Sequence, residues 1–153
     1  MKFRLVSIAF VLCCSLPASA AVRGDEARYV GGTLGGIAEN TEGKLDVSGQ
    51  LEMIFTTKRS TTLVPYKGIA ALDYGEKAGR RVAVAFAASP LFKKRKHYLT
   101  ITFIDEAGTK QYAVFELAKG IVNPVVRRLE NSSGKKLAFA TEATRKQFEK
   151  ETK

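Results

Sequence analysis

The sequence has 153 residues, 45% of them hydrophobic, and carries 25 Lys and Arg against 15 Asp and Glu, a formal net charge of +10. A chain of this length can bury one good core without help from disulfides or a metal. A positive field of this size raises the local concentration of anionic molecules such as lipid headgroups, acidic glycans and nucleic acid. Composition therefore predicts one basic domain, stable without disulfides or a metal, whose partners are anionic.

The first 20 residues have the three parts of a secretory signal peptide. Lys2 and Arg4 form the positive region, residues 5–16 are apolar, and small residues lead to a cleavage position between Ala20 and Ala21. The apolar stretch is shorter than the roughly 20 residues that span a bilayer, which favours cleavage over anchoring. We therefore expect an exported protein, periplasmic or secreted and peripheral to any membrane it meets, and we expect no nucleic acid as a partner.

Both cysteines, Cys13 and Cys14, lie inside this segment, so the mature chain is expected to have no thiol. Loss of Lys2 and Arg4 leaves 23 basic and 15 acidic residues, a net charge of +8. A lipid-anchored chain beginning at Cys14 is a minor alternative, because Cys13 and Val11 fit poorly where a small residue and a leucine are expected.

Next in chain order, residues 21–43 combine paired glycines with few large apolar side chains, which predicts an irregular, Gly-rich N-terminal arm. From Lys44 the pattern changes to short runs of period two, typical of strands with one buried face. The segment from Asp105 to Gly108 is typical of a hairpin turn. The predicted strands are residues 45–47, 51–56, 61–64, 69–74, 82–87, 98–104 and 110–117.

Residues 121–129 place apolar side chains at three- and four-residue spacing, and Gly134 follows, which predicts one amphipathic helix with a glycine stop. Pro124 leaves two alternatives: Asn123 caps the helix with Pro124 as its first residue, or the helix is kinked. A short strand-like piece over 136–140 and a charged C-terminal tail, residues 141–153, complete the chain. The predicted fold is mainly β, a barrel or roll of about seven antiparallel strands with one C-terminal helix, in a single domain over 44–140.

Residues capable of catalysis are few. The mature chain has one histidine, no cysteine and no Gly-x-Ser-x-Gly motif. His97, Asp105 and Ser89 have the residue types of a catalytic triad, but nothing in the sequence places them together. A single imidazole with scattered carboxylates gives no zinc or copper ligand set, and no acidic loop has calcium spacing. We therefore predict a protein that is not an enzyme and that uses no metal or cofactor.

The segment 79–97, here called the basic-flanked loop, holds an apolar run between two basic clusters. One interpretation is a buried strand with solvated flanks. The other is a peripheral membrane contact, with apolar side chains in the acyl boundary and basic ones among anionic headgroups. The candidate binding residues on that interpretation are Arg80, Arg81, Phe86, Leu91, Phe92, Lys93, Lys94, Arg95 and Lys96.

Several short stretches resemble those of small exported bacterial proteins with a pleckstrin-homology-like domain. The matching stretches are Tyr29-Val30-Gly31-Gly32-Thr33, Pro65-Tyr66 with Ile69, Leu72-Asp73-Tyr74-Gly75, Gly79-Arg80-Arg81, Ser89-Pro90-Leu91-Phe92, Lys93 to Ile101, Phe115-Glu116-Leu117 and Gly134-Lys135-Lys136. The resemblance implies a small barrel with a helix at one end, and lipid or peptide binding, which are the common activities of such domains. It supplies no ligand residues.

The expected function is thus a non-enzymatic binding domain at the cell envelope that contacts an anionic membrane surface or another polyanion through the basic-flanked loop. The alternative is a protein-interaction module that accepts a partner segment at the sheet edge near Pro65, or in a groove between helix and sheet.

Overall fold

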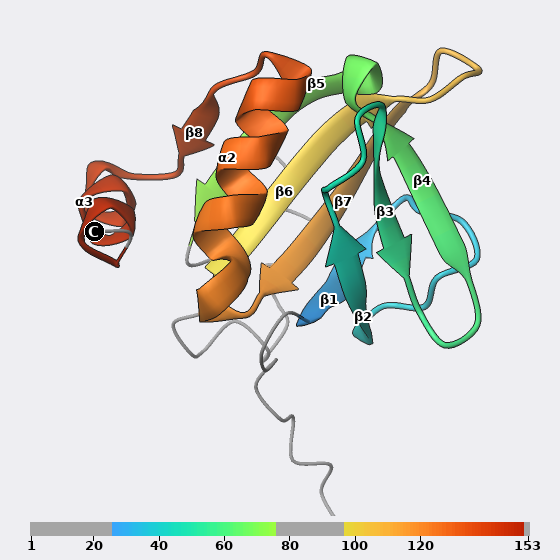
Figure 1. Ribbon diagram of the computed structural model, residues 1–153, viewed down its shortest axis with the longest axis horizontal. Coiled ribbons are helices and arrows are strands. Elements are labelled where there is room, and N and C mark those ends of the chain that lie inside the picture. The colour runs from blue at the N-terminus through green and yellow to red at the C-terminus, as the bar shows by residue number, and fades with distance from the viewer. Residues whose placement is uncertain (1–25, 76–96, 152–153) are drawn as a thin grey trace, which may run out of the picture.

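The computed structural model describes residues 26–75 and 97–151 (Figure 1). Its elements are β1 (Glu26–Gly32), β2 (Thr41–Asp46), β3 (Glu52–Thr56), β4 (Thr61–Pro65), the short 3-10 helix η1 (Tyr66–Gly68), β5 (Ile69–Gly75), β6 (His97–Ile104), β7 (Lys110–Leu117), a second 3-10 helix η3 (Lys119–Ile121), α2 (Val122–Ser133), β8 (Leu137–Phe139) and α3 (Glu142–Glu151). None of the described helices is long and apolar enough to cross a membrane.

The eight described strands form one sheet in the order β4-β3-β2-β1-β7-β6-β5-β8. Two antiparallel meanders, β1 to β4 and β5 to β7, are joined by pairing of β1 with β7, and β8 pairs in parallel with β5. The protein is mainly β with a helix after the strands, as predicted. The sheet is not closed, however, because β8 rather than β4 occupies the second edge of β5. The predicted strand at 82–87 lies outside the described residues.

The prediction of an irregular arm over 21–43 is wrong for Glu26–Gly32, which form β1 at the centre of the sheet, and for residues 41–43, which begin β2. Ala27 and Tyr29 are 0% and 1% exposed. Position 32 in this strand requires glycine, because a Cβ there would clash with the main-chain carbonyl oxygen of Tyr112 on β7. Its φ of 144° is also one that other residues rarely adopt. The glycines therefore mark a close approach of two strands as well as a loop.

Helix α2 lies across one face of the sheet (Figure 1) and is the main cover of the hydrophobic core. Pro124 is the third residue of the helix, a position the sequence did not predict. It needs no kink, because the first four N–H groups of a helix have no partner within it. The predicted stop is confirmed: Gly134 has φ of 69°, and its N–H donates to the Glu130 carbonyl over 2.9 Å. The helix residues in the core are Val122, Val125, Val126 and Leu129.

Arg128 closes one side of the space between α2 and the sheet. Its guanidinium donates to the carbonyl oxygens of Val47 at 3.0 Å and Gly49 at 2.7 Å, in the β2–β3 connection. The Tyr66 hydroxyl donates to the same Val47 oxygen over 2.9 Å. These bonds fix the second half of α2 against the β2–β3 connection.

The C-terminal segment is attached more firmly than a solvated tail. In α3 the ring of Phe148 lies 4.9 Å from that of Tyr74 in β5 and 5.4 Å from that of Phe139 in β8. The other described side chains of α3 are mostly charged and exposed, as predicted. The folded unit therefore extends beyond the predicted limits of 44 and 140 on both sides.

Candidate functional site

The predicted binding residues of the basic-flanked loop lie outside the described residues, as do Ala20 and Ala21 at the predicted cleavage position. What the structure gives is where that loop begins and ends. Gly75 at the end of β5 pairs with Tyr98 near the start of β6, so the segment 76–96 joins two neighbouring antiparallel strands. Its contact with a membrane remains a prediction.

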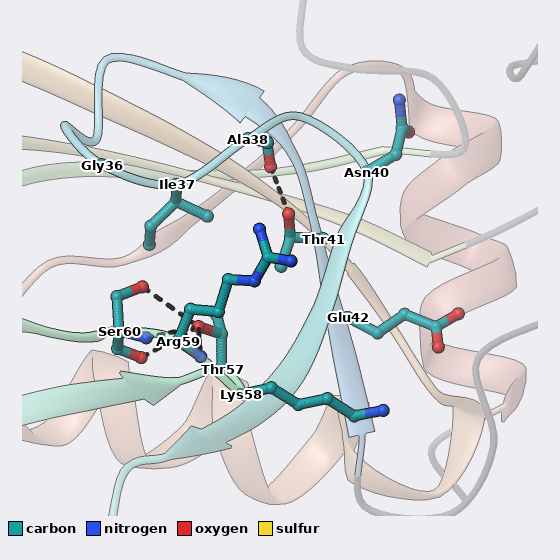
Figure 2. Close-up of a pocket in the computed structure, with 10 residues that line it drawn as sticks. All are labelled: Gly36, Ile37, Ala38, Asn40, Thr41, Glu42, Thr57, Lys58, Arg59 and Ser60. Atoms are coloured by element: carbon teal, nitrogen blue, oxygen red, sulfur yellow. Dashed lines mark hydrogen bonds between the residues drawn. The ribbon is translucent and has the colours of Figure 1, made fainter.

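A pocket of about 450 Å³ lies between the loop that connects β1 to β2 and the turn that connects β3 to β4 (Figure 2). The two segments belong to neighbouring hairpins of the first meander, since β2 pairs with both β1 and β3. The pocket is lined by Gly36, Ile37, Ala38, Asn40, Thr41, Glu42, Thr57, Lys58, Arg59 and Ser60.

The β1–β2 loop is held in place at both ends. The Thr33 N–H donates to the Tyr112 carbonyl over 2.9 Å, and the Tyr112 N–H donates to the Thr33 hydroxyl over 3.0 Å. At the far end, Asn40 has φ of 62°, a left-handed conformation that asparagine tolerates better than most residues. The Thr41 hydroxyl donates to the Ala38 carbonyl over 2.6 Å. One wall of the pocket is therefore shaped by bonds within the fold.

The opposite wall is a two-residue turn whose tip is Lys58 and Arg59. The Thr57 hydroxyl accepts hydrogen bonds from the N–H groups of Arg59 at 3.2 Å and Ser60 at 2.9 Å. The Arg59 and Ser60 amides are thereby satisfied inside the turn, and the two side chains at its tip are exposed. A ligand here would be held by side chains.

The charge of the pocket is positive. In the described part of the chain, neither the Lys58 ammonium nor the Arg59 guanidinium has a hydrogen bond or ion pair, and Figure 2 shows Arg59 reaching from the turn toward Ala38 and Thr41. The one acidic lining residue, Glu42, is paired with Arg28 at 2.5 Å. Two cations against one compensated carboxylate favour an anionic ligand.

Beside the pocket, a row of polar side chains crosses the outer face of the sheet, the face opposite α2; we call it the polar row. Glu42, Arg28, Glu116 and Tyr98 are direct partners on β2, β1, β7 and β6. The guanidinium of Arg28 lies 3.4 Å from the Glu116 carboxylate, and both residues are 5% exposed. Burial, then the nearby Glu116 charge, raises the pKa of Tyr98 to about 12.

His97 and Asp105, two of the three candidate triad residues, are not brought together. His97 begins β6 and Asp105 follows its last residue, so eight strand steps of about 3.3 Å, roughly 26 Å, separate them, and Ser89 lies outside the described residues. His97 Nδ1 is instead 2.5 Å from the Tyr74 hydroxyl. Within 26–75 and 97–151, no three His, Cys, Asp or Glu side chains gather as a metal site would require.

Sequence reasoning missed both the pocket and the polar row. A signal for the first was present: Thr57-Lys58-Arg59-Ser60 joins two alternating runs and places two cations at a hairpin tip. For the second there was none, because Arg28 and Glu116 are 88 residues apart and meet only when β1 pairs with β7. No protein-family model matches the chain, and no curated protein matches it. The site is therefore assigned from its own geometry.

Proposed function

We propose that this protein is a non-enzymatic, exported binding domain that holds an anionic group at the cell envelope, either on an anionic membrane surface or on another polyanion. The observation that carries the proposal is the pair Lys58 and Arg59, which face a pocket whose only carboxylate already pairs with Arg28. The basic-flanked loop, through its basic and apolar residues between Arg80 and Lys96, is proposed as a second contact with the same kind of surface.

The energetics of the pocket are adequate for a weak, reversible contact. A basic side chain near an anionic membrane contributes on the order of 1 kcal/mol. Two such side chains give about 2 kcal/mol, or roughly a 30-fold change in affinity. Because both side chains are exposed, this attraction falls as salt shortens the screening length.

We also propose a pleckstrin-homology-like identity for the fold. The support is the order of elements: seven described strands, β1 to β7, precede helix α2, which covers one face of the sheet. The parallel strand β8 and the helix α3 are additions to that plan. A solved experimental structure compared with known folds would test this identity directly.

The function is tested by sedimentation of the mature chain, residues 21–153, with anionic and with neutral vesicles at low and high salt. We expect binding to anionic vesicles that is lost at high salt. The double variant Lys58→Ser/Arg59→Ser should bind about 30-fold more weakly. A quadruple change of Lys93, Lys94, Arg95 and Lys96 to Ser tests the basic-flanked loop separately.

The matched control is Lys135→Ser/Lys136→Ser, which removes the same charge from two exposed residues between α2 and β8. It should lose less than about threefold, since charge far from the contact acts only through a screened field. If this control weakens binding as much as the pocket variant does, the pocket assignment is wrong. Binding of a soluble sulfated glycan but not of vesicles would identify the polyanion as a glycan.

A further inference from the structure

Strand β4 is an edge of the described sheet, with β3 on its only paired side. Unpaired main-chain groups along such an edge can accept another strand. In an antiparallel ladder, residues alternate between positions that bond to the neighbour and positions whose main-chain groups point away from it. Which residues of β4 point outward therefore depends on the phase of the β3–β4 ladder.

Two main-chain hydrogen bonds between β3 and the ends of β4 fix that phase. The Thr57 N–H donates to the Ser60 carbonyl over 2.8 Å, and the Tyr66 N–H donates to the Leu51 carbonyl over 2.9 Å. Counting in steps of two from either end places Thr62 and Val64 in the bonded positions. The main-chain groups of Thr61, Leu63 and Pro65 therefore face the open edge.

The open edge of β4 has unpaired main-chain groups for several hydrogen bonds to a partner strand. An antiparallel partner opposite these residues can form two hydrogen bonds with Thr61, two with Leu63 and one with the carbonyl of Pro65, which has no N–H. Pro65 also ends the ladder. A partner segment would thus engage about five residues.

The side chains beside this edge are apolar at its middle. Leu63 is 51% exposed and lies directly opposite Ile54 of β3 on the outer face of the sheet. A partner residue paired with Leu63 would place its side chain on the same face and extend this row. Leu51, 74% exposed, lies at the Pro65 end, where its carbonyl accepts the Tyr66 bond.

Both ends of β4 carry positive charge. Lys58 and Arg59 lie at the turn before it, and Lys67 is exposed in η1 after it. Glu52, opposite Pro65, partly offsets the charge of Lys67, so the positive charge is strongest at the Thr61 end, where Lys58 and Arg59 lie. The charges of the edge therefore complement a strand with an apolar centre and acidic ends, most strongly at the Thr61 end.

We propose that β4 accepts, by strand addition, an extended segment of another protein that has an apolar residue at its centre and Asp or Glu at both ends. This surface is separate from the anion-binding pocket, although Lys58 and Arg59 border both. A second copy of this chain fits less well. Antiparallel self-pairing about Leu63 places the Lys58 and Arg59 of one copy beside the Lys67 of the other, and it places Thr61 opposite Pro65, where one bond cannot form.

The test is an amide NMR titration of the mature chain with the peptide Glu-Glu-Val-Thr-Ile-Thr-Val-Glu-Glu, blocked at both ends. We expect shifts concentrated at Thr61 to Leu63 and slowed hydrogen exchange of the Thr61 and Leu63 amides.

Leu63→Pro removes an outward N–H and no bond to β3, so the variant should fold and bind about tenfold more weakly. Leu63→Ser tests the apolar centre of the edge without removing a backbone group. Its matched control is Ile104→Ser, which makes a similar change at another exposed apolar residue.

Two further peptides separate strand addition from charge alone. A version with its central amide N-methylated keeps all four carboxylates and cannot pair, so it should bind at least tenfold more weakly. Equal binding of this peptide, or shifts confined to residues 36–42 and 57–60, would show that the carboxylates occupy the pocket and would overturn the edge proposal while leaving the anion site intact.

A version of the peptide with Lys in place of Glu should also fail to bind. Protection of Leu63 that rises with protein concentration and without peptide would overturn the proposal in favour of a second copy.

Discussion

The two faces of the sheet are stabilised in different ways, and the contrast is sharpest between Phe115 and Glu116, neighbours on β7. Phe115 is 0% exposed on the inner face under α2, where its ring lies 5.0 Å from that of Phe55 and 5.9 Å from that of Tyr29. Glu116, 5% exposed, lies on the outer face in the polar row. One strand therefore contributes alternately to an apolar core and to a buried ion pair.

The difference shows what each face can tolerate. Apolar packing loses free energy in proportion to the side-chain volume removed, and the loss is independent of pH. A buried ion pair contributes little net stability, but it is damaging to break, because one charge is left without compensation. The inner face sets how stable the protein is, and the outer face makes that stability depend on charge.

The largest effect should come from the inner face. Phe115→Ala removes a fully buried ring from contact with two others and should lower the free energy of unfolding by about 3 to 5 kcal/mol. Urea denaturation followed by circular dichroism measures this. A loss below about 1 kcal/mol would mean that the core does not depend on these aromatic contacts.

The next effect is a loss of stability in alkali. Because burial raises the pKa of Tyr98 to about 12, above the value near 10 in the unfolded chain, the folded state holds that proton more tightly. This contribution is complete below pH 10 and is lost as the pH rises to 12, about 3 kcal/mol for two pKa units. Tyr98→Phe should lose less stability than the wild type between pH 9 and pH 12, measured by urea denaturation at each pH. Parallel curves would show that Tyr98 is not responsible.

The smallest effects compare the two carboxylates that flank Arg28. Glu116→Gln should destabilise the protein by about 2 kcal/mol, because the buried Arg28 guanidinium loses the negative charge that Glu116 supplies, although an amide oxygen remains as an acceptor. Glu42→Gln should lose less than about 1 kcal/mol, since the Glu42 side chain is 52% exposed. Thermal unfolding of both variants and of the double variant measures the order. A larger loss at Glu42 would contradict the assignment of burial along the polar row.

Local sequence pattern was sufficient to predict six of the described strands, the short strand-like piece at 136–140 that forms β8, the hairpin turn after β6 and the helix that ends near Gly134. These features depend mainly on spacing of two or of three and four residues along the chain. The same reasoning failed at β1. Its central position follows from pairing with β7, some 90 residues away, and its glycines have the composition of a loop.

The candidate sites divide in the same way. The residue types were in the sequence: two cations at the tip of a short turn, an apolar residue with Thr and Pro around it, and an isolated Arg and Glu. Only the tertiary structure decided that Lys58 and Arg59 face the β1–β2 loop across a pocket, that Arg28 and Glu116 are buried together, and that β4 is left at an edge. The alternation of apolar and polar residues along a strand indicates which of its faces is buried. The order of strands in a sheet is instead set by contacts between residues far apart in the chain.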